Sequence, residues 1–131
     1  WELMFRLNVT TMKNATRAAV PALSATGKAA IVNVGALGAL SGAADMSAYC
    51  AAKSTVMRLT ESFSEELKNK GVNVNAVLPS IINTPPNREA MPDADFDDWV
   101  SPEKLAEVMC FLASDSASAV HGVLLPVKGL V

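Results

Sequence analysis

Ala29-Ala30-Ile31-Val32-Asn33-Val34 is a short, apolar and partly β-branched run, which is typical of a buried parallel strand. Residues 72–78 form a second run of the same kind, and Pro79 ends it. Between the two runs, apolar residues at helical spacing predict a helix from about Asp45 or Ser47 to Lys70. A helix that joins two buried strands implies a parallel sheet with a right-handed crossover.

The pattern continues on both sides of this core. Pro21 is expected to break or kink the first helix. Ser101-Pro102-Glu103 carries a cap, a proline and an acid in the order that opens a helix. In chain order we predict a helix over residues 2–26, a loop over 35–44, a left-handed stop at Gly71, a polar loop over 80–100, a helix from Ser101 to about Ser114 and a strand over 122–127. This alternation predicts an α/β fold in one domain.

Composition limits the kinds of partner. The chain has 131 residues, is 50% hydrophobic and carries a net charge of −2. No basic face exists to bind nucleic acid, and no apolar run reaches the ~18 residues of a membrane helix. We therefore expect neither nucleic acid nor a membrane as a partner, and a cytoplasmic location in which Cys50 and Cys110 are reduced and buried. Neither cysteine has a CxxC or CxxH neighbour, so no metal site is expected, and His121 reads as a loop residue.

Tyr49 and Lys53 are four residues apart in the predicted central helix, so their side chains share one helix face. A phenol titrates near ~10, and a nearby ammonium lowers that pKa because it stabilises the phenolate. The ammonium can also donate hydrogen bonds to a cofactor ribose. The pair can thus exchange a proton with a carbonyl or an imine. By itself this spacing is also common among unrelated surface residues.

The surroundings of the pair resemble the short-chain dehydrogenase/reductase family. Ser47-Ala48-Tyr49-Cys50-Ala51-Ala52-Lys53 follows a buried strand and a loop of small residues, and it precedes a strand that ends at Asn75-Ala76-Val77-Leu78-Pro79. The resemblance covers residues 8–129. It implies the carboxy-terminal half of a three-layer, Rossmann-like parallel sheet. It also implies an oxidoreductase that uses NAD or NADP to transfer hydride to or from a small molecule, either a carbonyl compound or a dihydropterin.

The resemblance assigns roles to individual residues. Tyr49 resembles the catalytic acid/base, Lys53 the residue that binds the nicotinamide ribose and lowers the pKa of the tyrosine. Asn8 resembles the helix asparagine that holds a water in the proton relay. The predicted cofactor-binding residues are Tyr49, Lys53, Pro79, Ser80, Ile81 and Thr84.

Two positions depart from the family pattern. Ala36 occupies the place, thirteen residues before Tyr49, of a serine that polarises the substrate carbonyl, and Ser41 is out of register with that place. Ser80 occupies the place of a glycine. Both departures, and the spacing of Thr84-Pro85, Asn87-Arg88, Met91-Pro92, Ala94-Asp95-Phe96 and Trp99, are similar to dihydropteridine reductases. The aromatic residues of this loop could equally serve only to pack it.

The phosphate-binding part of the family pattern, Thr-Gly-x-x-x-Gly-x-Gly, follows no predicted strand. The chain opens on Trp1 in a helical pattern without a cap, so we expect preceding sequence to be missing and residues 1–131 to be a partial domain that is inactive alone. In the family, the helices predicted at residues 2–26 and 47–70 commonly pack against their copies, which implies a homodimer or homotetramer. The alternative, which Ala36 favours, is a non-catalytic, degenerate reductase that acts as a dimerisation or binding module.

Overall fold

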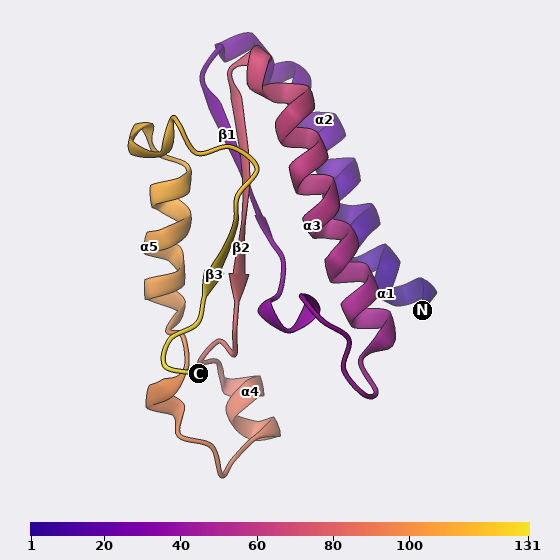
Figure 1. Cartoon of the computed structure of the whole chain (residues 1–131), viewed down its shortest axis with the longest axis vertical. Coiled ribbons are helices and arrows are strands. Elements are labelled where there is room, and N and C mark those ends of the chain that lie inside the picture. The colour runs from indigo at the N-terminus through magenta and orange to yellow at the C-terminus, as the bar shows by residue number, and fades with distance from the viewer.

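The chain forms a parallel sheet covered by helices on both faces (Figure 1). The computed structural model describes all 131 residues. The strands are β1 (Ala29–Val34), β2 (Val72–Pro79) and β3 (Leu124–Val127), in the spatial order β1-β2-β3. Helices α2 and α3 lie on one face and α5 on the other. The predicted α/β fold with three layers is confirmed.

Strand β2 is the centre of the sheet. It pairs with β1 from Ala29↔Val72 to Val34↔Val77, and with β3 from Ala76↔Leu124 to Pro79↔Val127. The apolar run of β2 is explained by this position, because helices cover both of its faces. The other edge of β1 pairs with no strand of this chain.

The predicted first helix is one helical rod in three parts. They are α1 (Glu2–Phe5), a π-helical turn (Arg6–Thr10) and α2 (Thr11–Thr26). Pro21 lies inside α2 without ending it, so the predicted break is wrong, while the alternative of a kink stays a prediction. A proline removes one helical hydrogen bond, and the packing of α2 against β1 outweighs that loss.

Helix α3 (Ser47–Leu67) is the predicted central helix, and a 3-10 turn at Lys68–Lys70 extends it to Gly71. Gly71 has φ +72°, which confirms the left-handed stop, and a Cβ there would lie 2.1 Å from the carbonyl oxygen of Gly27. The predicted cap by Asp45 or Ser47 is wrong. Met46 takes the cap position, and no side chain accepts a hydrogen bond from the first turn.

The predicted polar loop over residues 80–100 contains the short helix α4 (Pro85–Ala90) and a 3-10 turn at Phe96–Asp98. Helix α5 (Pro102–Leu112) begins as expected, with Ser101 Oγ accepting a hydrogen bond from the Lys104 N–H at 3.2 Å. After it, β3 begins two residues later than predicted. The preceding Gly122 has φ +67° and is still part of the turn.

Three clusters of apolar side chains join the helices to the sheet. Under α3 the buried residues are Ala36, Ala39, Cys50, Met57 and Leu78, under α5 they are Val77, Val100, Leu105 and Leu112, and near the end of α3, where α2 also packs, they are Leu67, Val72 and Val74. Both thiols are free, but Cys110 is exposed, so its predicted burial is wrong: it lies on the outer side of α5. None of the helices has the length and apolar character that a membrane crossing requires.

Candidate active site

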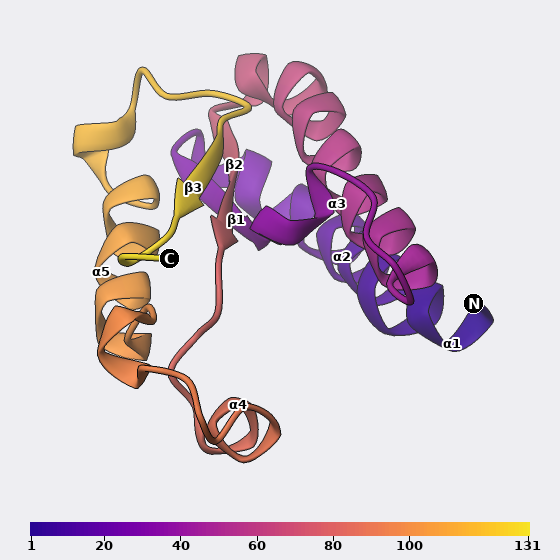
Figure 2. The same ribbon diagram turned by 60° about the horizontal axis from the view of Figure 1, so that its bottom comes forward.

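Tyr49 and Lys53 occupy the first two turns of α3, at the carboxyl end of β1. The Lys53 ammonium donates a hydrogen bond to the Val34 carbonyl oxygen at 3.0 Å. Val34 is the last residue of β1, so this bond ties the helix to the strand end. Figure 2 shows the loop after β1 running beside the first turns of α3. The predicted pair therefore lies at the carboxyl ends of the strands, where open α/β folds bind their ligands.

Both members of the pair are half-buried, and burial governs their protonation. Burial, and secondarily the neighbouring Cys50, raises the pKa of Tyr49 above its usual value. Burial lowers the pKa of Lys53. Desolvation is the larger cause of the Tyr49 shift and Lys53 is not among its causes, so the role of Lys53 in lowering the pKa of Tyr49 stays a prediction. Tyr49 is therefore a protonated phenol at neutral pH, which is the form that donates a proton.

The loop after β1 is fastened to α3 by two residues whose part was not predicted. Cys50 Sγ lies 3.7 Å from the Gly38 carbonyl oxygen, and Ser54 Oγ donates to the Ala39 carbonyl oxygen at 2.9 Å. Cys50 and Ser54 are one helical turn apart, so they reach the same short turn, Leu37–Ala39. Their spacing is the signal that could have indicated a contact between helix and loop.

Ala36 lies at the start of this loop, in the apolar cluster against which Tyr49 packs. It is buried and extended, with φ −155° and ψ 134°, and it shares an apolar cluster with the Tyr49 ring. No hydroxyl therefore stands where the family places its serine. Ser41 is exposed and, as expected from its register, is not an evident substitute.

Asn8 lies in the π-helical turn Arg6–Thr10, and both this turn and α1 pack against α3. Single π turns inside helices are rare and frequent at functional sites. The Asn8 side-chain amide donates within its own helix, to the Met4 carbonyl oxygen at 3.0 Å. Its predicted role in holding a water stays a prediction.

The predicted cofactor loop follows β2, and its members differ in what they can offer a ligand. Pro79 is buried at the strand end. Ser80 uses both of its donors within the protein, its N–H on Val127 O at 3.0 Å and its hydroxyl on Lys128 O at 2.6 Å. The Ile81 carbonyl accepts from the Val100 N–H. The half-buried Thr84 hydroxyl makes no hydrogen bond within the chain, so it is free to bind a ligand.

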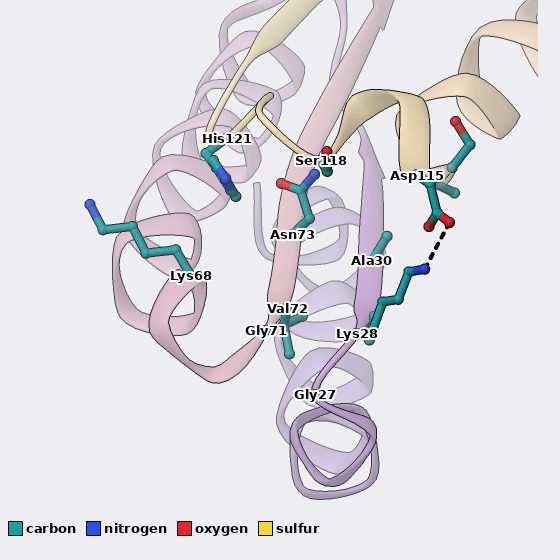
Figure 3. A pocket seen from close by; sticks show the side chains of 13 residues that line it. Gly27, Lys28, Ala30, Lys68, Gly71, Val72, Asn73, Asp115, Ser118 and His121 are labelled. Carbon is teal, nitrogen blue, oxygen red and sulfur yellow. Dashed lines mark hydrogen bonds and ion pairs between the residues drawn. The ribbon is translucent and has the colours of Figure 1, made fainter.

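A pocket lies elsewhere, at the amino ends of the strands (Figure 3). It has a volume of about 450 Å³, and its lining includes Lys28, Lys68, Asp115 and the exposed His121. Lys28 and Asp115 form an ion pair with each other at 2.7 Å. The pocket contains none of the predicted site residues. No group of three or more His, Cys, Asp or Glu side chains is arranged to hold a metal ion.

Comparison with known proteins shows the family to which the chain belongs. Residues 1–129 match the family model described as enoyl-(acyl carrier protein) reductase. The chain belongs to the short-chain dehydrogenase/reductase family. It is 32% identical to 2-(S)-hydroxypropyl-CoM dehydrogenase 3 of Xanthobacter autotrophicus, over 98% of this chain and 56% of that protein. The chain thus spans about half the length of the short-chain dehydrogenases/reductases that it matches.

Two solved structures of short-chain dehydrogenases/reductases share the fold. A putative gluconate 5-dehydrogenase of Beutenbergia cavernae, with bound NADP, is 30% identical, with a TM-score of 0.86 over 95% of this chain and 54% of that one. A 3-ketoacyl-(acyl-carrier-protein) reductase of Brucella melitensis, complexed with NADH, is 30% identical, with a TM-score of 0.81 over 93% of this chain and 53% of that one. The family and the Rossmann-like fold predicted from the sequence are confirmed.

Proposed function

We propose that residues 1–131 are the catalytic half of an NAD(P)-dependent oxidoreductase that transfers hydride between nicotinamide and a carbonyl compound. One observation carries the proposal: Tyr49 and Lys53 lie together at the carboxyl end of β1, with the lysine anchored on Val34 O at 3.0 Å. We propose that in the working enzyme this half is joined to a dinucleotide-binding half. The part of the matched relatives that this chain does not cover is long enough for such a half.

The residues present suit a nicotinamide cofactor, which supplies the hydride when bound. The Lys53 ammonium has three N–H donors and uses one on Val34, so two remain for a ribose. The Thr84 hydroxyl, in the loop between β2 and α4, makes no hydrogen bond within the chain and can bind the cofactor. The N–H and hydroxyl of Ser80 donate to Val127 O and Lys128 O, and its part in cofactor binding stays a prediction.

Proton transfer belongs to Tyr49. In reduction, the phenol O–H donates its proton to the carbonyl oxygen of the substrate as that oxygen gains negative charge. The raised pKa of Tyr49 keeps this proton in place at neutral pH. Asn8 is proposed to take part in refilling the proton from solvent. Because Ala36 offers no hydroxyl, Tyr49 is the one side chain proposed to stabilise that oxygen.

Substrate, assembly and location are part of the proposal in less detail. A quinonoid dihydropterin is one substrate that tolerates the missing hydroxyl, since it is already electron-poor. None of the relatives described above is a dihydropteridine reductase, so this stays a prediction.

We propose a homodimer or homotetramer through residues 2–26 and 47–70, and a cytoplasmic location that suits two free thiols.

The test is turnover by the complete enzyme, read as NADH and NADPH oxidation with ketones, quinones and a quinonoid dihydropterin. Tyr49→Phe keeps the ring and removes the acid, so it should lower kcat by about 10²–10⁴ while leaving thermal unfolding unchanged. The chain of 131 residues alone should show no turnover. Near-normal turnover by Tyr49→Phe would show that another group transfers the proton.

A second candidate function rests on Ala36, whose methyl group replaces a catalytic hydroxyl. On this view the chain is a degenerate reductase that acts as a dimerisation or binding module. The same assay separates the two, since such a module turns over none of the substrates even when the complete protein binds NADH.

A further inference from the structure

Charged residues divide unevenly between the two ends of the sheet. The segments after β1, β2 and β3 (residues 35–46, 80–101 and 128–131) hold six acidic and two basic side chains, a net charge of −4. The acids are Asp45, Glu89, Asp93, Asp95, Asp97 and Asp98, and the bases are Arg88 and Lys128. At the opposite end, Figure 3 shows Lys28 and Lys68 beside the pocket there. The end that carries Tyr49 is therefore the negative one.

The one cation of the long loop after β2 is already engaged. Arg88 Nε donates to Asn83 Oδ1 at 2.6 Å, and its guanidinium lies 5.1 Å above the Phe96 ring. Asn83 in turn donates to the Phe96 carbonyl oxygen at 3.1 Å. These contacts hold α4 against the turn at Phe96–Asp98, and they direct the charge of Arg88 into the loop. Arg88 thus stabilises the loop and is poorly placed to bind an anionic substrate.

Apolar side chains are exposed at the same end of the sheet. Val34 ends β1, Leu40 and Met46 belong to the loop before α3, and Met91 follows α4. Their exposed fractions are 39%, 58%, 41% and 37%. Large apolar side chains beside a few polar groups are the usual lining of a small-molecule site, and these four lie at the same end of the sheet as Tyr49 and Lys53. Of the cations at this end, Arg88 is engaged within its loop and Lys53 is hydrogen-bonded to the Val34 carbonyl oxygen.

From these observations we propose that the substrate is an uncharged, largely hydrocarbon carbonyl compound, and that Glu89 and Asp93 help to exclude carboxylates, sulfonates and phosphates. The inference rests on the proposed function and names its substrate class. An excess of charge of one sign at one end of a protein repels ligands of that sign. Glu89 and Asp93 are exposed and form no hydrogen bond or ion pair in the chain, so no partner within the chain neutralises their charges.

The experiment compares substrates that differ by one carboxylate. The complete enzyme is assayed with cyclohexanone against 4-oxocyclohexanecarboxylate, and with pentan-2-one against 4-oxopentanoate. At low salt we expect kcat/KM to favour the neutral member of each pair by at least about tenfold. Added sodium chloride should raise kcat/KM for the carboxylates and leave the neutral ketones unchanged.

The double variant Glu89→Gln, Asp93→Asn tests the residues themselves. Removing two charges from this end of the sheet should raise kcat/KM for the carboxylates by about threefold to fivefold, with no change for the ketones. The control is Glu65→Gln, Asp115→Asn, which removes two charges from exposed ion pairs outside the candidate site and should change neither value.

The outcomes are distinct. A preference for the carboxylate, or a double variant that affects both members of a pair equally, overturns this inference and leaves the proposed function standing. No turnover of any ketone, in an enzyme that folds and binds NADH, overturns the proposed function and this inference with it.

Discussion

At the scale of single residues, the site depends on a tyrosine that the fold keeps protonated. Its ring packs on the cluster that contains Ala36, and its hydroxyl is left without a partner in the chain. The position of Tyr49, one helical turn from Lys53, was predictable from the spacing of the two residues alone. The direction of the pKa shift was not, because it depends on how deeply the loop after β1 buries the ring.

The chain contains a single tyrosine, so the ultraviolet absorbance of phenolate reports Tyr49 alone. Burial raises the pKa of Tyr49, which means that the folded chain holds this proton more tightly than the unfolded chain does. We expect a titration midpoint above the value of about 10 for free tyrosine, and a return to about 10 in urea. A folded midpoint below the unfolded one would mean that a cation, and not burial, controls Tyr49.

Ala36→Ser places a hydroxyl at the position where the family carries a serine. The backbone at Ala36 is extended, so serine fits it without strain. In enzymes whose native site contains such a hydrogen-bond donor, its loss lowers the rate by about 10²–10³. We therefore expect the substitution, which adds a donor, to raise kcat for ketone reduction by about tenfold. The control Ala39→Ser adds the same group to a neighbouring buried alanine and should bring no gain. An Ala36→Ser enzyme no faster than the parent would show that the substrate needs no second donor.

At the scale of elements, the sequence predicted the three strands and the long helices because their patterns are local. Strand β2 is mostly apolar, with Asn73 and Asn75 as its polar residues, and α5 opens on Ser101 and Pro102. Helix α4 also opens on a hydroxyl residue and prolines, at Thr84-Pro85, but it was absorbed into a loop interpreted as irregular. The π turn at Arg6–Thr10 has no local signature, since it forms where the rod packs on α3.

Gly71 joins α3 to β2 at the point where the chain touches the end of α2. Both Gly71 and Gly27 are left-handed, with φ +72° and +65°, but of the two only Gly71 would bring a Cβ within 4 Å of other backbone atoms. Gly27→Ala should lower the free energy of unfolding by about 1–2 kcal/mol, the usual cost of this conformation. Gly71→Ala should cost at least about 3 kcal/mol, because the Gly27 carbonyl must also move. Equal losses in urea unfolding would contradict the close approach.

At the scale of the whole molecule, two surfaces of the chain remain open. The outer edge of β1 presents backbone groups that pair with no strand here. Beside it lies an apolar groove whose lining includes Met12, Leu23 and Ile31. The first helical rod also exposes Trp1, Leu3 and Leu7, at 70%, 65% and 61%. Surfaces of this kind promote association in water.

We therefore expect the chain of 131 residues, expressed alone, to form dimers or aggregates, and sedimentation at micromolar concentration to show little monomer. The double variant Leu3→Glu, Leu7→Glu removes apolar surface from the rod only, because both side chains are exposed and leave the core untouched. If the rod pairs with its copy, as the proposed interface requires, this variant should shift the population toward monomer. If the β1 edge drives association, the variant should aggregate as the parent does. A single sharp monomer with cooperative thermal unfolding, in the unaltered chain, would contradict both routes, because it would mean that neither open surface needs a partner.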